Sequence, residues 1–177
     1  MVADIADIAD IAVGGLPAHG ATSPRPARLL VVDDEPNIAR LLQTWFELSG
    51  WEVLTAHDGL DAIALVEAVA PDVLVLDMML PGADGLEVMR RVRALDPTIA
   101  VVIHSARDSY EDRERALGAG AAAYVIKPCA LHRLEDEVCR ALAGCQAQVN
   151  RTASSGKPNP EAAHGALTAD AQPPVAR

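Results

Sequence analysis

Short apolar segments alternate with helical segments along the middle of the chain, and this alternation constrains the fold more than any other feature. The predicted strands span 28–33, 51–56, 72–77, 99–105 and 121–127. The predicted helices span 36–49, 58–70, 84–95, 110–118 and 131–143. The strands are short and almost continuously apolar, which is typical of a parallel sheet buried on both faces. The pattern therefore predicts an α/β fold, a five-stranded parallel sheet with helices on both sides.

The two ends of the chain lack this pattern, so we expect one domain, residues 28–146, between two disordered tails. The N-terminal tail, 1–27, contains a three-residue Ala-Asp-Ile repeat from Ala3 to Ala12, followed by several glycines and prolines. A period of three fits neither a strand nor a clean amphipathic helix. The C-terminal tail, 147–177, is rich in Ala, Pro, Ser and Gly and has no apolar periodicity. Such a composition predicts disorder.

Composition limits the classes of function. The formal net charge of −10 over 177 residues argues against broad binding to a phosphate backbone, so we expect no direct contact with nucleic acid. The three cysteines, Cys129, Cys139 and Cys145, form no CxxC pair and no zinc spacing, which favours a reducing compartment. No apolar run is long enough to cross a membrane, and the acidic N-terminus does not resemble a signal peptide. We therefore expect a cytoplasmic protein.

Polar side chains stand at the ends of four of the five predicted strands. Asp33 ends the first strand and Asp34 follows it, while Asp77 ends the third, Ser105 the fourth and Lys127 the fifth. Taken singly, each has an ordinary explanation as a helix cap, a turn residue or a solvated charge. The carboxyl ends of parallel strands meet at one edge of the sheet, however, and that edge is where such folds bind ligands.

Three carboxylates at one sheet edge would repel one another, and a divalent cation would relieve that repulsion. Magnesium takes oxygen ligands and keeps several waters, so two or three carboxylates suffice to hold it. A lysine at the same edge suits a phosphoryl group, and a serine hydroxyl can donate to a phosphoryl oxygen. A remaining carboxylate can act as a nucleophile and form an aspartyl phosphate.

The segments that carry these residues resemble a known family. "LLVVDDEPN", "VLVLDMMLPGADG", "HSA" and "YVIKP" occur in this order on five β–α units. Together they look like the receiver domain of two-component response regulators, over roughly residues 28–145. The resemblance implies a flavodoxin-like, doubly wound sheet of strand order 2-1-3-4-5. It also implies a phosphorelay protein that accepts a phosphoryl group from a histidine kinase or phosphotransfer protein and signals to a downstream protein.

The resemblance also implies a role for each site residue. Asp77 would be the phosphoacceptor, with Asp33, Asp34, Asp77 and the backbone carbonyl of Met79 around Mg²⁺. Lys127 would pair with the phosphoryl oxygens, and the peptide bond between Lys127 and Pro128 would be cis. Ser105 and Tyr124 would form the conformational switch. The domain would catalyse its own phosphorylation and slow dephosphorylation, although it would act chiefly as a signalling switch.

Alternatives and departures from the family pattern remain. A receiver-like interaction module that does not need phosphate would keep the fold, as would a transcriptional regulator truncated before its DNA-binding domain. A flavodoxin-like binder of FMN would need a phosphate-cradling loop, whereas "DDEPN" is acidic. The pair Met79 and Arg107 is similar to the residues at these positions in receivers of the winged-helix subfamily. The acidic and basic residues that form that subfamily's dimer interface are replaced in this sequence. Cys129 stands where similar receivers often have Phe, and we expect the ring of His104 to face outward.

Overall fold

A computed structural model of the chain describes residues 25–155, and the Ala-Asp-Ile repeat lies outside these residues. The five predicted strands are present as β1 (Arg28–Val32), β2 (Glu52–Ala56), β3 (Val73–Leu76), β6 (Ala100–Ser105) and β7 (Ala123–Ile126). They form one parallel sheet in the order β2-β1-β3-β6-β7. This is the order 2-1-3-4-5 counted along the sheet's own strands, so the predicted topology is confirmed.

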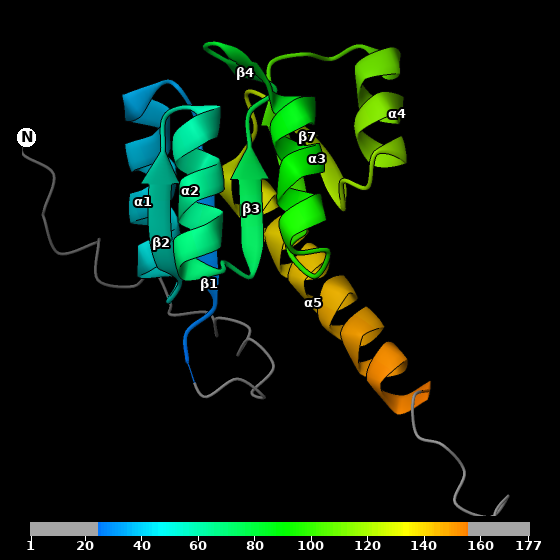
Figure 1. Cartoon of the computed structure of the whole chain (residues 1–177). Coiled ribbons are helices and arrows are strands. Elements are labelled where there is room, and N and C mark those ends of the chain that lie inside the picture. Colours follow the sequence, from blue (N-terminus) through cyan, green and yellow to red (C-terminus); the bar gives the residue numbers. More distant parts are fainter. Residues whose placement is uncertain (1–24, 156–177) are drawn as a thin grey trace, which may run out of the picture.

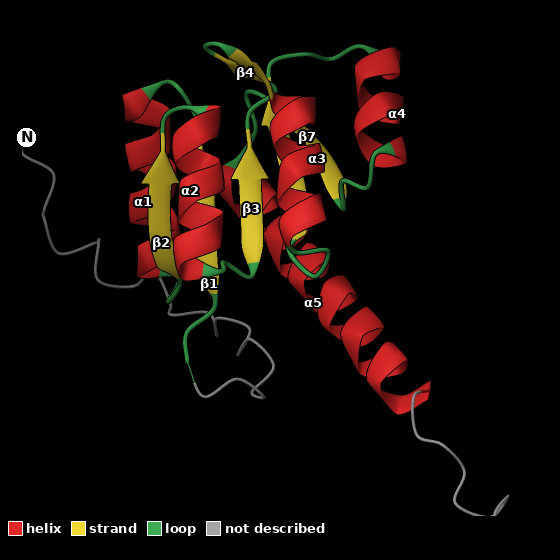
Figure 2. Cartoon of the chain, viewed as in Figure 1, coloured by secondary structure: helices red, strands yellow, loops and turns green. Residues whose placement is uncertain are grey.

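Five helices cover the sheet: α1 (Pro36–Leu48), α2 (Gly59–Val69), α3 (Gly85–Leu95), α4 (Tyr110–Gly118) and α5 (Leu131–Ser155). Figure 2 shows the resulting layers, with helices in front of and behind the strands. One apolar cluster lies between the sheet and helices α2 and α3, and a second lies between the sheet and helices α1 and α5. Alternate residues of each central strand enter the two clusters: in β3, Leu74 joins the first and Val75 the second.

The turn after β3 contains a small hairpin that the sequence did not predict. Strands β4 (Met79–Leu80) and β5 (Ala83–Asp84) pair in antiparallel fashion around Pro81 and Gly82. Gly82 has φ of 73°, a conformation that favours glycine after a proline in a tight turn. The hairpin carries the chain from the end of β3 to the start of α3, directly above the predicted site.

Helix α5 is longer than predicted. It was expected to end near residue 143, before a disordered tail from 147, but it continues through 147–155 to Ser155. Leu142 and Cys145 continue the apolar stripe that packs against the sheet, so the helix carries on past residue 143. Figure 1 shows the last turns of α5, in orange, extending beyond the sheet. Residues 156–177 lie outside the described part of the chain.

Residues 25–27, which directly precede β1, contact the sheet. The guanidinium of Arg25 bonds the carboxylate of Asp72 at 2.8 and 3.0 Å. The carbonyl of Ala27 accepts a hydrogen bond from Glu52. Between residues 25 and 155, no helix combines the length and the apolar character that crossing a membrane requires.

Candidate functional site at the carboxyl edge of the sheet

The acidic part of the site is built on two neighbouring strands, β1 and β3. Asp33 and Asp77 are the first residues after these strands, and both continue the backbone hydrogen bonding of the sheet. The amide of Asp33 donates to Ala56 at 3.1 Å, and the amide of Asp77 donates to Val32 at 2.9 Å. The main chain under both carboxylates is therefore held by neighbouring strands, which fixes where the side chains start.

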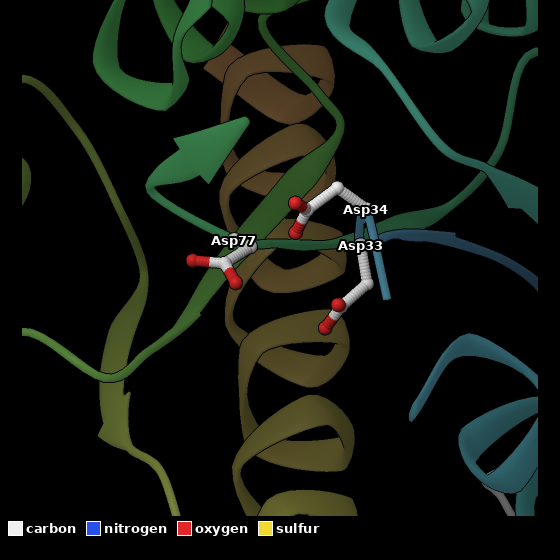
Figure 3. Close-up of side chains that lie close together, drawn as sticks. All are labelled: Asp33, Asp34 and Asp77. Atoms are coloured by element: carbon white, nitrogen blue, oxygen red, sulfur yellow. The ribbon is translucent and has the colours of Figure 1, made fainter. Parts of the chain in front are cut away.

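The three predicted metal-binding aspartates lie together. Each of Asp33, Asp34 and Asp77 offers a carboxylate oxygen within 4.8 Å of those of the other two. Figure 3 shows Asp33 and Asp34, from consecutive positions, beside Asp77 from the neighbouring strand end. Asp33 and Asp77 are only 2% and 7% exposed, whereas Asp34 is exposed. Within residues 25–155, no other group of three or more His, Cys, Asp or Glu residues is spaced to hold a metal ion.

Lys127 links two of these carboxylates. Its Nζ lies 2.6 Å from Oδ2 of Asp33 and 2.6 Å from Oδ2 of Asp77. Burial alone would lower the pKa of Lys127, but the hydrogen bonds and charges of the two aspartates outweigh burial and raise the pKa. Lys127 is therefore a cation at neutral pH. Its charge against three aspartates leaves the site with a formal charge of −2, from one positive and three negative groups.

The second oxygen of each buried carboxylate is bound by the backbone. Oδ1 of Asp33 accepts from the amide of Glu35 at 3.1 Å, and Oδ1 of Asp77 accepts from the amide of Met79 at 3.0 Å. Each carboxylate is thus held at one oxygen by Lys127 and at the other by an amide two residues along the chain. The orientation of Asp77 therefore depends on the path of the backbone from 77 to 79.

Ser105 and Tyr124 meet at the loop that follows β6. Ser105 is fully buried, and its Oγ accepts from the amide of Arg107 at 3.3 Å. The hydroxyl of Tyr124 donates to the carbonyl of Arg107 at 2.9 Å. Burial raises the pKa of Tyr124, while a hydrogen bond with Ser105 opposes that effect. The amide of Lys127 also donates to the carbonyl of Ser105 at 2.8 Å, which ties this loop to the lysine.

A cavity of about 440 Å³ lies over the exposed side of the acidic group. Its lining includes Asp34, Met79, Asp84 and Arg107. The Met79 side chain is 54% exposed, and Arg107 makes an ion pair with Asp112 at 3.6 Å. Asp34 therefore faces solvent on this side, whereas Asp33 and Asp77 are buried beside it and do not line the cavity.

Two further sequence-based expectations concern residues next to the site, and one of them is wrong. The predicted cis peptide bond between Lys127 and Pro128 is present. The outward orientation predicted for His104 is wrong, because this residue is only 6% exposed and its Nε2 lies 3.6 Å from Sγ of Cys129. Burial, then the charge of Lys127, lowers the pKa of His104 to about 4. Strand β6 lies between two other strands, and helices cover both faces of the sheet, so side chains on either face of β6 are buried. The predicted topology could therefore have indicated that His104 is buried.

Sequence reasoning also missed Gly85, the first residue of α3. It is buried, and a side chain there would collide with the main chain at Asp77 and Met78. A glycine at the start of a helix has many explanations, so the sequence alone carries no signal for this contact.

Comparison with known proteins agrees with this geometry. The family model for the response regulator receiver domain matches residues 29–139. The transcriptional regulatory protein TrcR of Mycobacterium tuberculosis is 46% identical over 122 residues, covering 69% of this chain and 48% of TrcR. The response regulator MprA of Mycobacterium avium is 38% identical over 141 residues, covering 80% of this chain and 57% of MprA. The chain thus spans about half the length of these curated relatives.

Solved structures show the same fold. NtrX from Brucella abortus superposes with a TM-score of 0.69 at 30% identity, covering 73% of this chain and 29% of NtrX. A CheY-like receiver domain protein from Methanospirillum hungatei superposes with a TM-score of 0.67 at 26% identity, covering 70% of this chain and 98% of that protein. The family match, the fold and the acidic edge with its lysine agree, and the chain belongs to the response regulator receiver domain family.

Proposed function

We propose that the protein is a phosphorelay receiver in which Asp77 accepts a phosphoryl group from a histidine kinase or phosphotransfer protein. The observation that supports this most directly is the position of Asp77. Its carboxylate lies 2.6 Å from a lysine ammonium and shares a 4.8 Å cluster with two further aspartates. One carboxylate thus has a cation beside it for the phosphoryl oxygens and an oxygen-rich site for a metal next to it.

The donor set fits Mg²⁺. All three side chains offer carboxylate oxygens, which hard cations prefer, and Asp34 is open to solvent for the water ligands that Mg²⁺ retains. A cation also offsets the formal charge of −2 that remains after Lys127 is counted. Bound Mg²⁺ supplies neutralisation of the charge on the phosphoryl group during transfer. Asp33, Asp34 and Asp77 would hold it.

The hairpin after β3 supports a role for the Met79 carbonyl. Leu80 and Ala83 pair across the turn, and Met79 is opposite Asp84. In a two-residue hairpin the pair beside the turn exchanges the hydrogen bonds and the next pair does not. This register leaves the Met79 carbonyl outside the hairpin's own hydrogen bonds, so it is free to join the metal ligands.

In the transfer step, an ionised oxygen of Asp77 attacks the phosphorus of a partner's phosphohistidine. The new O–P bond forms as the P–N bond breaks, and the released imidazole nitrogen takes its proton from solvent. Lys127 is already beside the carboxylate and would pair with the phosphoryl oxygens. The negative charge on these oxygens would then lie close to the ammonium group during transfer. The buried setting strengthens that electrostatic pairing.

The switch would operate through the loop after β6. Ser105 and Tyr124 both bond the backbone of Arg107, so a movement of the Ser105 hydroxyl toward a phosphoryl oxygen changes the hydrogen bonds around Tyr124. Tyr124 lies on β7, an edge strand that contacts α4 and α5. The phosphoryl group would shift the populations of two loop arrangements, and a downstream protein would recognise the α4–β7–α5 face.

The test uses a small phosphodonor. Incubation with Mg²⁺ and acetyl phosphate should give a phosphate adduct by intact mass, and Asp77→Asn should abolish it. The matched control is Asp84→Asn, which alters an aspartate that lines the cavity beside Asp34 and leaves a residue able to cap α3. This control should keep the adduct. Absence of an adduct on the wild-type protein would instead favour an interaction module that works without phosphate.

A further inference from the structure

Gly85 makes an unusually close approach to the main chain that carries Asp77. A Cβ atom at Gly85 would lie 2.5 Å from the carbonyl oxygen of Asp77 and 2.6 Å from Cα of Met78. Both are backbone atoms, which cannot turn aside as a flexible side chain does. The amide of Gly85 also donates to the carbonyl of Met78 at 3.2 Å. The start of α3 is thus packed directly against the residues that follow β3.

Space, not backbone conformation, requires the glycine. The described glycines with positive φ are Gly50, Gly82 and Gly120, and Gly85 is not among them. Any residue could adopt its backbone angles, and most would favour the helix more than glycine does. The missing side chain is needed because two segments of main chain meet here.

A second contact supports the same residue. The amide of Asp77 is bonded to Val32 in β1, and the start of α3 at Gly85 abuts the Asp77 carbonyl. The carboxylate itself is oriented by the Met79 amide at 3.0 Å and by Lys127 at 2.6 Å. The position of α3 therefore sets the path of residues 77–79, and that path sets the direction of the carboxylate.

We propose that Gly85 is a positioning residue for phosphoryl transfer, which lets α3 hold the Asp77 carboxylate in its reactive orientation. The proposal rests on the proposed function of Asp77. Replacing Gly85 by alanine requires a shift of about 0.5 Å or more, from 2.5 Å to the shortest Cβ contacts of about 3.0 Å. A misplacement of about 1 Å at a reacting group lowers the rate by about 100-fold, so we expect Gly85→Ala to lower it by about 10- to 100-fold.

The experiment measures the rate of adduct formation by intact mass with saturating Mg²⁺ and acetyl phosphate. Gly85→Ala should retain a native circular dichroism spectrum but form the adduct about 10- to 100-fold more slowly. Gly144→Ala is the matched glycine control, because nothing lies within 4 Å of a Cβ at that helical position. It should react at the wild-type rate. An unchanged rate in Gly85→Ala would overturn the proposal.

A purely structural effect of Gly85→Ala is separated by a second control in the same helix. Val92 is fully buried in α3, and Val92→Ala lowers the melting temperature by leaving a cavity without touching residues 77–79. It should nevertheless phosphorylate at the wild-type rate while it is folded. An equal loss of rate in Gly85→Ala and Val92→Ala would mean that stability, not position, controls the reaction, and the proposal would fail.

If Gly85→Ala is partly unfolded in buffer, all variants are compared in sucrose, which favours the compact state. A slow rate that persists in the refolded variant supports the positioning role, and recovery of the wild-type rate contradicts it. Failure of the proposed function itself gives a different result, because the wild-type protein would then form no adduct at all.

Discussion

Strand β3 has an aspartate just outside each end, and the two are used in opposite ways. Asp72, before the strand, faces Arg25, and nearby Arg28 pairs with Glu52, so two arginines balance two acids. Asp77, after the strand, shares one lysine with Asp33 and has Asp34 beside it. The amino end of the sheet is therefore electrically balanced, whereas the carboxyl end retains a formal charge of −2.

Burial separates the two ends further. In the amino-end pairs the side chains are between 28% and 47% exposed, while those of Lys127, Asp33 and Asp77 are between 3% and 13% exposed. Water screens the first set, so it contributes little free energy and serves to anchor residues 25–28. The second set is desolvated, so each charge depends on its partners. The carboxyl-end residues therefore have the unbalanced charge and the burial expected of a binding site, whereas the amino-end ion pairs only hold residues 25–28 in place.

The largest expected effect comes from removing the lysine. In the absence of metal, Lys127→Met leaves Asp33 and Asp77 buried without their cation, and breaking a buried pair in this way costs about 3–5 kcal/mol. Urea unfolding should show this loss. Mg²⁺ should then stabilise the variant more than it stabilises the wild type, because the ion binds a more negative folded state. If Mg²⁺ stabilised the two proteins equally, the carboxyl end of the sheet would not carry the excess negative charge.

His104 gives an intermediate effect that depends on pH. Its pKa is about 4 in the folded protein and about 6.5 when unfolded, so the unfolded state binds more protons between these values. The stabilising contribution of a neutral, buried His104 should therefore be fully present above about pH 6.5. The free energy of unfolding should fall as the pH drops toward 4, by up to about 3 kcal/mol. His104→Gln should flatten this part of the stability–pH curve measured by urea unfolding.

The control for this measurement is His132, an exposed histidine on α5. His132→Gln should keep the wild-type slope between pH 6.5 and 4. If both variants lose the slope equally, or if neither does, then burial of His104 is not the source of the pH dependence at this end of the sheet.

The contrast between the two ends of the sheet was only half visible in the sequence. The alternation of predicted strands and helices places four polar residues at one edge of the sheet, because parallel strands have their carboxyl ends together. These residues are Asp33, Asp77, Ser105 and Lys127. The amino-end network depends on Arg25, which stands among prolines in a segment without periodicity. Its contact with Asp72 is tertiary, across 47 positions of chain, and no local pattern encodes it.

The remaining differences between sequence and structure also come from tertiary packing. Helix α5 continues past residue 143, where Cys145 packs against the apolar cluster on the sheet. The inward ring of His104 depends on neighbouring strands and helices on both faces of β6. Gly85 is required by two main-chain segments that meet after folding. Local propensity describes none of these contacts, because each one forms only when separate elements pack against each other.

The smallest expected effect tests the balanced end of the sheet. Arg25→Gln removes both hydrogen bonds to Asp72, but that carboxylate keeps the amide of Arg28 at 2.8 Å. Since Arg25 is 39% exposed, the loss should be about 1 kcal/mol or less in urea unfolding and should shrink further at high salt. Adduct formation on Asp77 should be unchanged, because the two aspartates lie at opposite ends of β3. A loss as large as that of Lys127→Met, or one insensitive to salt, would show that the amino end is as desolvated as the carboxyl end.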